Sequence, residues 1–309
     1  MRTLALSFLI VVGAGSAYAD RSAAVPAPAP APQKSKSLAD LLAASSPTDW
    51  RTLDPEQTIY LDLPRGRVVI ELAEKLAPNH VANVKALARE HYFDGLSVMR
   101  AQDNYVAQWG DPDEKRQVKG AKKTLPPEFE RPAEGLPFVP LPDPDTYARE
   151  VGLSEGFPVA RDGKAGRAWG THCYGMVGAG RDNDPASGGG TELYAVIGHA
   201  PRHLDRNVTL LGRVVWGIEH LSTLPRGTGA LGFYEKPTER LPITAMRVAA
   251  DVPVGERTEL ELLRTDAPIF AQVIESRRNR RDDWYKVPAG RIELCNVPLP
   301  VRLRARDKK

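Results

Sequence analysis

Apolar and polar residues alternate on both sides of a Pro-Arg-Gly turn in the segment TIYLDLPRGRVVIELA, which begins at Thr58. Side chains of a strand point alternately to its two faces, so this pattern predicts a β-hairpin. The next segment, APNHVANVKALAREHYF, changes to a helical period, with Val81, Val84 and Ala88 spaced three and four residues apart. Pro78 suits the first turn of this predicted helix.

Short apolar runs bounded by turn residues predict most of the remaining elements. We expect one strand within 92–112, one at Met176–Ala179 and one at 193–198, a strand leading into a short helix in VTLLGRVVWGIEHLSTL, and a final strand in LPITAMRVAADV. Many short strands with few helices and Gly-rich turns are typical of a closed antiparallel β-barrel. The predicted fold class is therefore mainly β.

The N-terminus has the layout of an export signal. Arg2 precedes an apolar run at 4–12, and the small residues Ala17 and Ala19 are typical of a cleavage site. We therefore expect a signal peptide at 1–19, with a retained membrane anchor as the alternative. The apolar run is shorter than a bilayer requires, so no integral membrane span is expected once the signal is removed.

The predicted barrel spans 58–251 and is preceded by a linker at 20–57. This linker begins with alternating Ala and Pro, which favours an extended spacer, and its SLADLLAASS segment predicts a short helix. We expect ordered structure to start near Thr58. Within the barrel, 112–167 is long, polar and rich in Pro, which indicates an elaborated inserted loop with a short helix at 145–151.

A C-terminal extension at 252–309 follows, with one helix expected at 267–285 and one strand at 291–297. The chain contains two cysteines, Cys173 and Cys295. In an oxidising compartment a disulfide between them could persist and would join the extension to the main body; the equally open alternative is two separate buried thiols.

Composition and short motifs exclude several kinds of function. The 42 basic and 39 acidic residues leave a net charge of +3, which is too small to indicate a nucleic-acid or membrane partner. The segment HAPRH places His199 and His203 four apart, but the intervening proline disfavours a helical metal site and favours surface histidines. GAGRDNDPASGGGTE lacks the spacing of a phosphate-binding loop, and RRNRR is balanced by two following aspartates, which favours a solvated helix face.

Arg100 stands out because it interrupts an apolar strand. With alternating side chains, Leu96 and Val98 would share its face, so its guanidinium would project from an apolar surface. A buried guanidinium requires an acceptor or a charge partner. Arg100 is therefore either an ordinary edge or surface residue or a functional cation.

Five separated segments resemble, in the same order, the cyclophilin family of peptidyl-prolyl cis-trans isomerases. The family's Tyr-x-Gly-x-x-Phe-His-Arg pattern, followed after four residues by Phe-x-x-Gln-Gly-Gly-Asp, is similar to YFDGLSVMRAQDNYVAQWGD, in which Arg100, Tyr105 and Gln108 fall in step. MVGAG with GGGTELYAVI is similar to the family's Met-Ala-x-Ala-Gly and Gly-Ser-Gln-Phe-Phe-Ile segments. HLDRNVTLLGRVVWGIEHL is similar to Trp-Leu-Asp-Gly-x-x-x-Val-Phe-Gly-x-Val, and the opening hairpin and helix also match.

This resemblance implies a closed eight-stranded antiparallel β-barrel capped by two α-helices, and an isomerase that needs no cofactor and no metal. It implies that Arg100 and Gln108 are the catalytic residues. The residues implied to contact the substrate are Tyr105, Val106, Val177, Glu192, Tyr194, His203 and Leu204.

The chain departs from the family pattern at several positions of the implied site. A Glu, at Glu192, stands where the family has Gln, and its carboxylate would compete with substrate if it paired with Arg100. The other replacements are Met99 for His, Trp109 for Gly, Tyr194 for Phe and Val208 for His.

The function expected from these features is isomerisation of Xaa-Pro bonds in proline-containing segments of client proteins, by a monomer exported to the periplasm that assists folding there. The alternative is a catalytically weak module that binds peptide segments or a partner protein. A third hypothesis is that the loop at 112–167 or the C-terminal extension docks a dedicated partner.

Overall fold

A nine-stranded antiparallel sheet is the main feature of the computed structural model, which describes residues 36–304 other than 114 and 283. The order of the strands is β14-β4-β5-β12-β11-β13-β3-β2-β15. The predicted hairpin is confirmed, and every other segment predicted to be extended contains strands, although 92–112 and LPITAMRVAADV each hold two strands where one was expected. Their bounds are β2 (Thr58–Leu63), β3 (Gly66–Leu72), β4 (Ser97–Ala101), β5 (Val106–Gly110), β11 (Met176–Ala179), β12 (Leu193–Val196), β13 (Leu210–Trp216), β14 (Leu241–Pro242) and β15 (Ala245–Val248).

The sheet is a half-barrel, so the expectation of a closed eight-stranded barrel is wrong. Its two edges are β14 and β15, which follow one another in the chain. Ile243 donates its backbone N–H to Leu96, beside one edge, and Thr244 donates to Asp62 at the other, so two residues carry the chain between the edges. β14 is only two residues long and ends in Pro242, which has no N–H to extend a ladder.

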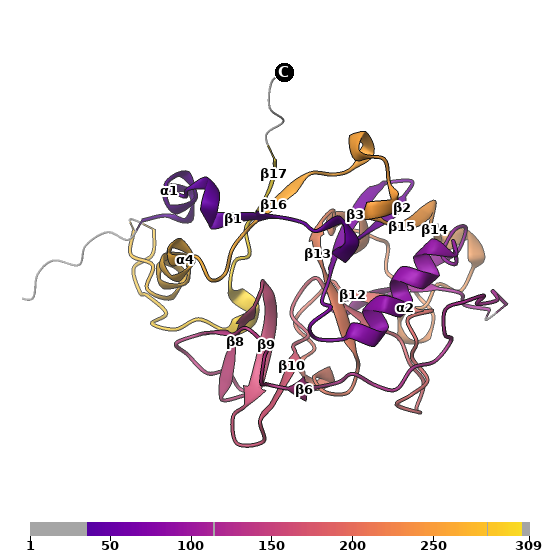
Figure 1. The fold of residues 1–309 in the computed structure, drawn as a ribbon, viewed down its shortest axis with the longest axis horizontal. Helices are drawn as coiled ribbons and strands as arrows, with labels where there is room; N and C mark the ends of the chain where they lie inside the picture. Colours follow the sequence, from indigo (N-terminus) through magenta and orange to yellow (C-terminus); the bar gives the residue numbers. More distant parts are fainter. Residues whose placement is uncertain (1–35, 114, 283, 305–309) are drawn as a thin grey trace, which may run out of the picture. The chain divides into compact units, whose positions relative to one another are not determined.

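Two helices cover the apolar interior of this sheet, as predicted. α2 (Pro78–Arg89) begins with proline in its first turn and packs against β13 and β15 (Figure 1). Its buried residues Val81, Val84 and Leu87 belong to one core cluster with side chains from the sheet. The second helix, α3 (Glu219–Ser222), is a single turn that follows β13 and contacts β3.

The segment 112–167 is not a loop, which corrects the sequence-based expectation. It contributes four strands and leads into a fifth, giving a separate sheet of order β6-β10-β9-β8-β7. The helix expected at 145–151 is absent from this fully described stretch, where β8 begins at Glu150. The bounds are β6 (Arg131–Pro132), β7 (Val139–Pro140), β8 (Glu150–Ser154), β9 (Phe157–Asp162) and β10 (Arg167–Gly170).

A tight turn explains why this segment forms a hairpin. Glu155 and Gly156 connect β8 to β9 with φ values of 50° and 93°, and a two-residue hairpin turn of this kind matches the right-handed twist of strands. Val151, Leu153 and Val159 of the hairpin are buried in a second apolar cluster that also contains residues of α1 and α4. Burial of this apolar face favours strands over the expected loop.

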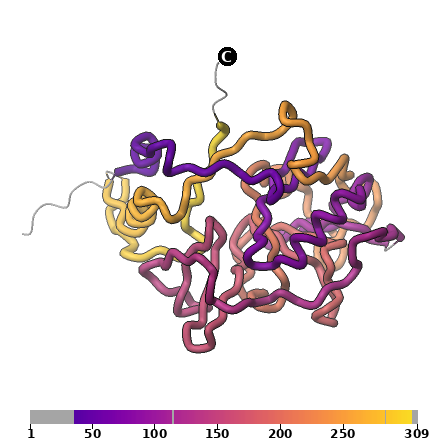
Figure 2. The backbone as a smooth tube through the Cα atoms, viewed as in Figure 1, coloured from indigo at the N-terminus to yellow at the C-terminus, as the bar shows by residue number. Residues whose placement is uncertain are grey.

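The segments before and after the barrel pair with one another. β1 (Trp50–Thr52), β16 (Leu260–Leu263) and β17 (Val301–Leu303) form a three-stranded sheet with β16 in the middle. α1 (Leu38–Ala43), the helix expected in SLADLLAASS, contacts α4 (Pro268–Arg278). Figure 2 shows the indigo N-terminal segment running beside the later, orange to yellow part of the chain.

These contacts change the predicted boundaries. Ordered structure starts before Thr58, since α1 and β1 precede it. The predicted helix at 267–285 is shorter and ends at Arg278, and the C-terminal strand lies at Val301–Leu303 rather than at 291–297, where a short 3₁₀ turn occurs instead. The signal peptide predicted at 1–19 and the Ala-Pro repeat lie outside the described residues.

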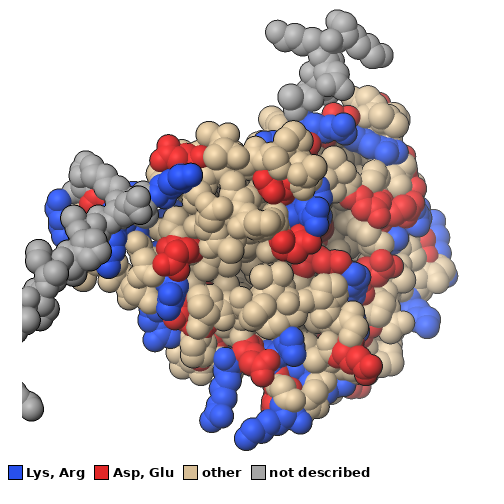
Figure 3. Space-filling view, turned by 60° about the vertical axis from the view of Figure 1, so that its left-hand side comes forward, with Lys and Arg blue, Asp and Glu red and all other residues tan. Residues whose placement is uncertain are grey.

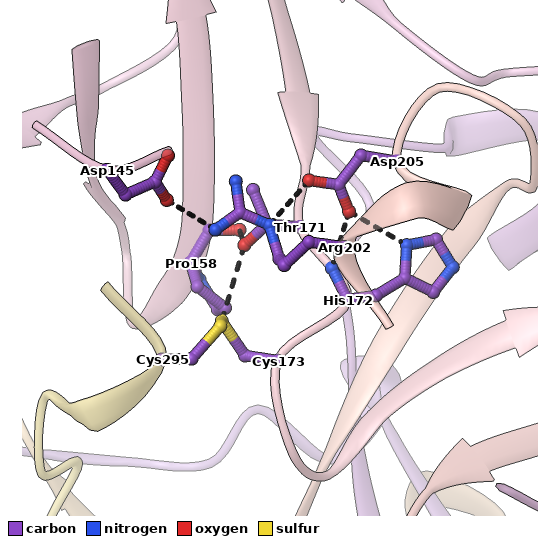
Figure 4. Close-up of a disulfide and its surroundings, with 8 residues drawn as sticks. All are labelled: Asp145, Pro158, Thr171, His172, Cys173, Arg202, Asp205 and Cys295. Carbon is purple, nitrogen blue, oxygen red and sulfur yellow. Dashed lines mark hydrogen bonds and ion pairs between the residues drawn. A yellow bond between two sulfur atoms is a disulfide. The ribbon is translucent and has the colours of Figure 1, made fainter. Parts of the chain in front are cut away.

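A disulfide joins Cys173, between β10 and β11, to Cys295 of the extension, with the two Cα atoms 4.9 Å apart (Figure 4). Of the two states that the sequence left open, the structure therefore shows the bridge. Both cysteines contact the second apolar cluster. The extension is thus attached covalently as well as by packing.

Two surface properties bear on partners. No helix within the described residues is long and apolar enough to cross a membrane. On the face shown in Figure 3, Lys and Arg side chains are interspersed with Asp and Glu side chains instead of forming a patch of one sign.

Candidate active site

A groove of about 1030 Å³ lies over one face of β4, β5 and β12. Val106 and Gln108 of β5 face it, while Ala107 and Trp109, which alternate with them along the strand, face the barrel core, as the strand period requires. The other sides of the groove come from the segments 111–123, 179–192, 204–208 and 231–240, so the start of the inserted segment also borders it. Residues distant in sequence therefore line one cavity.

A β-bulge aims Arg100 into this groove. In the pairing of β4 with β5, the register shifts between Val98 and Arg100, and Arg100 pairs with Gln108. Val98 is buried in the core, whereas Met99 and Arg100 both line the groove. The expectation that Val98 shares a face with Arg100 is therefore wrong, because the bulge inserts one residue into the alternation.

The Arg100 guanidinium is held by three neutral acceptors. Its Nε donates to the backbone oxygen of Leu231 at 2.7 Å, Nη1 donates to Gln108 Oε1 at 3.0 Å, and Nη2 donates to Gln102 Oε1. Its central carbon also lies 5.6 Å from the ring centroid of Tyr105 and 5.3 Å from that of Phe233.

The charge of Arg100 is retained in this setting. Burial lowers the pKa of the guanidinium below its ordinary value, and the charge interaction with Tyr105 opposes that shift. Arginine nevertheless remains protonated in proteins because its ordinary pKa lies far above neutral pH. The groove therefore contains a positioned, half-buried cation whose acceptors in the described chain carry no charge.

Gln108 separates this cation from Glu192. Its Oε1 accepts from Arg100, and its Nε2 donates to Glu192 Oε2 at 2.6 Å. The carboxylate of Glu192 is thus connected to the guanidinium through the amide of Gln108, an arrangement that differs from the direct pair considered from the sequence. With 8% exposure, Gln108 makes these bonds in a largely dehydrated position.

An apolar wall lies beside the cation. We use this name for Tyr105, Val106, Tyr194 and Val208, which pack together and line the groove. Tyr194 pairs with Gln108 across β12 and β5, so the wall adjoins the Arg100 side chain directly. Its hydroxyl is bonded to a buried histidine instead of facing solvent.

The structure brings together most of the residues implied by the resemblance. Arg100, Tyr105, Val106, Gln108, Glu192, Tyr194 and Leu204 all line the groove. Val177 does not, because it is fully buried in the barrel core. His203 is exposed and does not line the groove, but its ring stacks on Tyr105 with centroids 6.3 Å apart.

Three contacts of Arg100 were missed by sequence reasoning. Leu231 and Phe233 lie in a segment without a recognisable motif, and only the folded chain brings them to Arg100. Gln102 could have been found, since it lies two residues beyond Arg100, at the strand period. A metal site is not indicated: in the described part of the chain, no group of three or more His, Cys, Asp or Glu side chains could hold an ion.

The sequence is similar to known peptidyl-prolyl cis-trans isomerases. A family model described as cyclophilin type peptidyl-prolyl cis-trans isomerase/CLD matches residues 58–248. A probable peptidyl-prolyl cis-trans isomerase from Brucella suis is 29% identical over 178 residues, covering 57% of this chain and 76% of the relative. The human peptidyl-prolyl cis-trans isomerase-like 1 is 34% identical over 71 residues, covering 23% of this chain and 40% of the relative.

The fold has a counterpart among solved structures. A crystal structure of a cyclophilin from Hirschia baltica superposes with a TM-score of 0.67 and 24% identity, covering 88% of this chain and 99% of that one. This coverage extends beyond the matched range of the family model, so the likeness in fold includes regions outside the half-barrel.

Proposed function

Because the chain belongs to the cyclophilin-type peptidyl-prolyl cis-trans isomerase family, we propose that it accelerates rotation about Xaa-Pro bonds in the groove around Arg100. The observation that carries this proposal is a charged guanidinium with neutral acceptors beside an apolar wall. The wall offers a surface for a proline ring, and the cation lies next to it.

The chemistry requires a donor at the twisting bond. Resonance in the peptide bond imposes a barrier of about 18–20 kcal/mol to rotation. As the bond twists, the prolyl nitrogen becomes pyramidal and more basic, so a donor placed there stabilises the transition state more than the ground state. No covalent step is needed.

Arg100 retains donors for this purpose. A guanidinium has five N–H groups, and the bonds to Leu231, Gln108 and Gln102 use one on each of its three nitrogens. Each terminal nitrogen therefore keeps one N–H within the described structure. The three bonds fix the plane of the fork, which limits the reorganisation needed when the substrate twists.

The test compares wild-type protein with Arg100→Ala in an isomerase assay on a proline-containing tetrapeptide. A charged hydrogen bond of about 1.5–3 kcal/mol corresponds to a loss of roughly tenfold to a hundredfold in kcat/KM. Arg302→Ala is a matched control, since Arg302 is also a strand arginine over an aromatic ring, that of Trp50 at 3.9 Å. Its kcat/KM should equal the wild-type value.

A binding module with little turnover is the second candidate. Both ends of the Gln108 side-chain amide are engaged, one by Arg100 and the other by Glu192, which reduces its ability to hold a substrate backbone. Equal and negligible rates for wild type and Arg100→Ala, together with retained peptide binding, would favour this candidate over the enzyme.

We further propose that the protein acts in the periplasm, as a monomer, on proline-containing segments of exported proteins. The disulfide between Cys173 and Cys295 supports export, because such bonds persist in oxidising compartments. The signal-like N-terminus supports it as well. N-terminal sequencing of protein recovered from the periplasm should give a chain that starts at Asp20; an intact Met1 in a cytoplasmic fraction would contradict export.

A further inference from the structure

A series of buried polar side chains extends from the apolar wall of the groove into the protein. The Tyr194 hydroxyl lies 2.8 Å from Nε2 of His172, a residue with 0% exposure that does not line the groove. Nδ1 of His172 lies 3.0 Å from Asp205 Oδ1. The proposed reaction gives no role to this histidine.

The direction of each hydrogen bond follows from the chemistry of the groups. A carboxylate only accepts, so Nδ1 of His172 donates to Asp205 and Nε2 remains an acceptor. Burial lowers the pKa of His172, against the opposing effect of Asp205, and this favours the neutral ring. Tyr194 therefore donates its hydroxyl hydrogen to Nε2, and burial raises the pKa of Tyr194, which keeps the hydroxyl protonated.

Asp205 is itself held in place. Its Oδ1 also accepts from the backbone N–H of His172 at 2.9 Å, and its Oδ2 accepts from Arg202 Nε at 2.6 Å. Arg202 in turn donates through Nη1 to Asp145, which belongs to the segment inserted at 112–167 (Figure 4). The disulfide follows immediately, because Cys173 is the neighbour of His172 in sequence. The imidazole is thus fixed from several directions.

A glycine of the neighbouring strand leaves room for the side chain of Tyr194. Gly178 of β11 pairs with Tyr194, and a Cβ atom added there would lie 2.4 Å from the tyrosine oxygen. The ring therefore lies across a glycine. The Tyr194 hydroxyl is hydrogen-bonded to His172, so Tyr194 presents its aromatic ring to the groove instead of an exposed hydroxyl group.

From this geometry we infer that His172 is a positioning residue for the substrate site: it anchors the Tyr194 hydroxyl and so fixes the ring against which a proline packs. The inference rests on the proposed function of the groove. Arg100, which would act on the twisting bond, has no hydrogen bond to His172 or Tyr194 in the described structure, so the effect of His172 falls on substrate binding rather than on turnover.

The test measures KM and kcat separately in the tetrapeptide assay. His172→Ala is expected to raise KM about fivefold while kcat stays within about twofold, as for the loss of one buried hydrogen bond. In a Tyr194→Phe background, which has no hydroxyl to anchor, the same substitution should leave KM unchanged. His172→Gln, which restores an acceptor, should recover a KM near that of wild type.

His80→Ala is the matched control. His80 is equally buried, with 1% exposure, and pairs with Glu128 at 2.6 Å, but it does not line the groove and does not contact Tyr194. Its substitution should lower the unfolding midpoint without changing KM. An unchanged KM for His172→Ala would overturn the inference. An equal rise in KM when His172→Ala is introduced into wild type and into the Tyr194→Phe variant would also overturn it, because that result would indicate a structural role only.

The failure of the proposed function can be distinguished from the failure of this inference. If the wild-type protein does not isomerise the tetrapeptide, the enzymatic proposal fails. The same variants are then compared by NMR titration with an Ala-Pro peptide. A fivefold weaker Kd for His172→Ala, absent in the Phe background, would still support the positioning role, and equal Kd values would refute it.

Discussion

Removing the disulfide should strongly destabilise the protein. The perturbation is the double substitution Cys173→Ala with Cys295→Ala, or reduction of the wild-type protein. The bridge joins residues 122 apart in sequence. In the chain-entropy model, a loop of that length contributes about 5 kcal/mol, because the bridge restricts the unfolded ensemble.

Urea unfolding followed by tryptophan fluorescence measures this loss, since the chain contains 5 Trp residues. With an m-value of about 3 kcal/mol per molar urea, the midpoint should fall by roughly 1.7 M. The double variant provides its own control. The sequence contains only these 2 cysteines, so reductant should shift the wild-type midpoint and leave that of the variant unchanged.

A urea midpoint of the wild-type protein that stays the same after full reduction of the bridge would contradict this prediction. That result would mean that the unfolded chain keeps the two cysteine segments close even without the bridge, so that the bridge removes little of its conformational entropy. Both cysteines contact the second apolar cluster, and alanine keeps part of this packing, so a loss in the variant reports mainly on the covalent link.

Three other predictions concern an ion pair, the active site and the dependence of stability on pH. Glu71→Gln should cost about 3–5 kcal/mol of unfolding free energy, because it leaves the buried Arg213 without its carboxylate. Glu261→Gln, in the more exposed pair with Arg302, should cost at most about 1 kcal/mol. Equal urea midpoints for the two variants would contradict this prediction. Gln108→Ala should lower kcat/KM roughly tenfold in the isomerase assay, and an unchanged value would exclude its positioning of the guanidinium. Burial lowers the pKa of His172 in the folded state below its ordinary value of 6.5, so its contribution to stability is complete above pH 6.5 and is lost as the pH falls towards the folded pKa. His172→Gln should therefore flatten the decline of the urea midpoint between about pH 7 and 5. An unchanged slope would argue against this.

The strands of the half-barrel were predictable because their patterns are local. The hairpin around Pro64 and the helix beginning at Pro78 follow from periods of two and of three to four, which depend on residues next to one another. The ordered match of five segments then identified Arg100 and Gln108, and both line the groove.

The inserted sheet was missed for the opposite reason. Its strands β6 and β7 are two residues long, and their pairing partners lie at least 12 residues away, so a local pattern contains little information about them. The pairing of β1 with β16 joins residues more than 200 positions apart. Neither sheet could be read from periodicity within a short window.

Local patterns in the chain were therefore sufficient to predict the antiparallel elements of the half-barrel and the helix that begins at Pro78, and the resemblance to a family singled out Arg100. The half-open barrel, the bulge that turns Arg100 towards Gln108, and the bond from Tyr194 to His172 arise only when distant segments meet. The physical reason is that periodicity specifies which face of an element is apolar, while the partner buried against that face is selected by packing and hydrogen bonding across the whole fold.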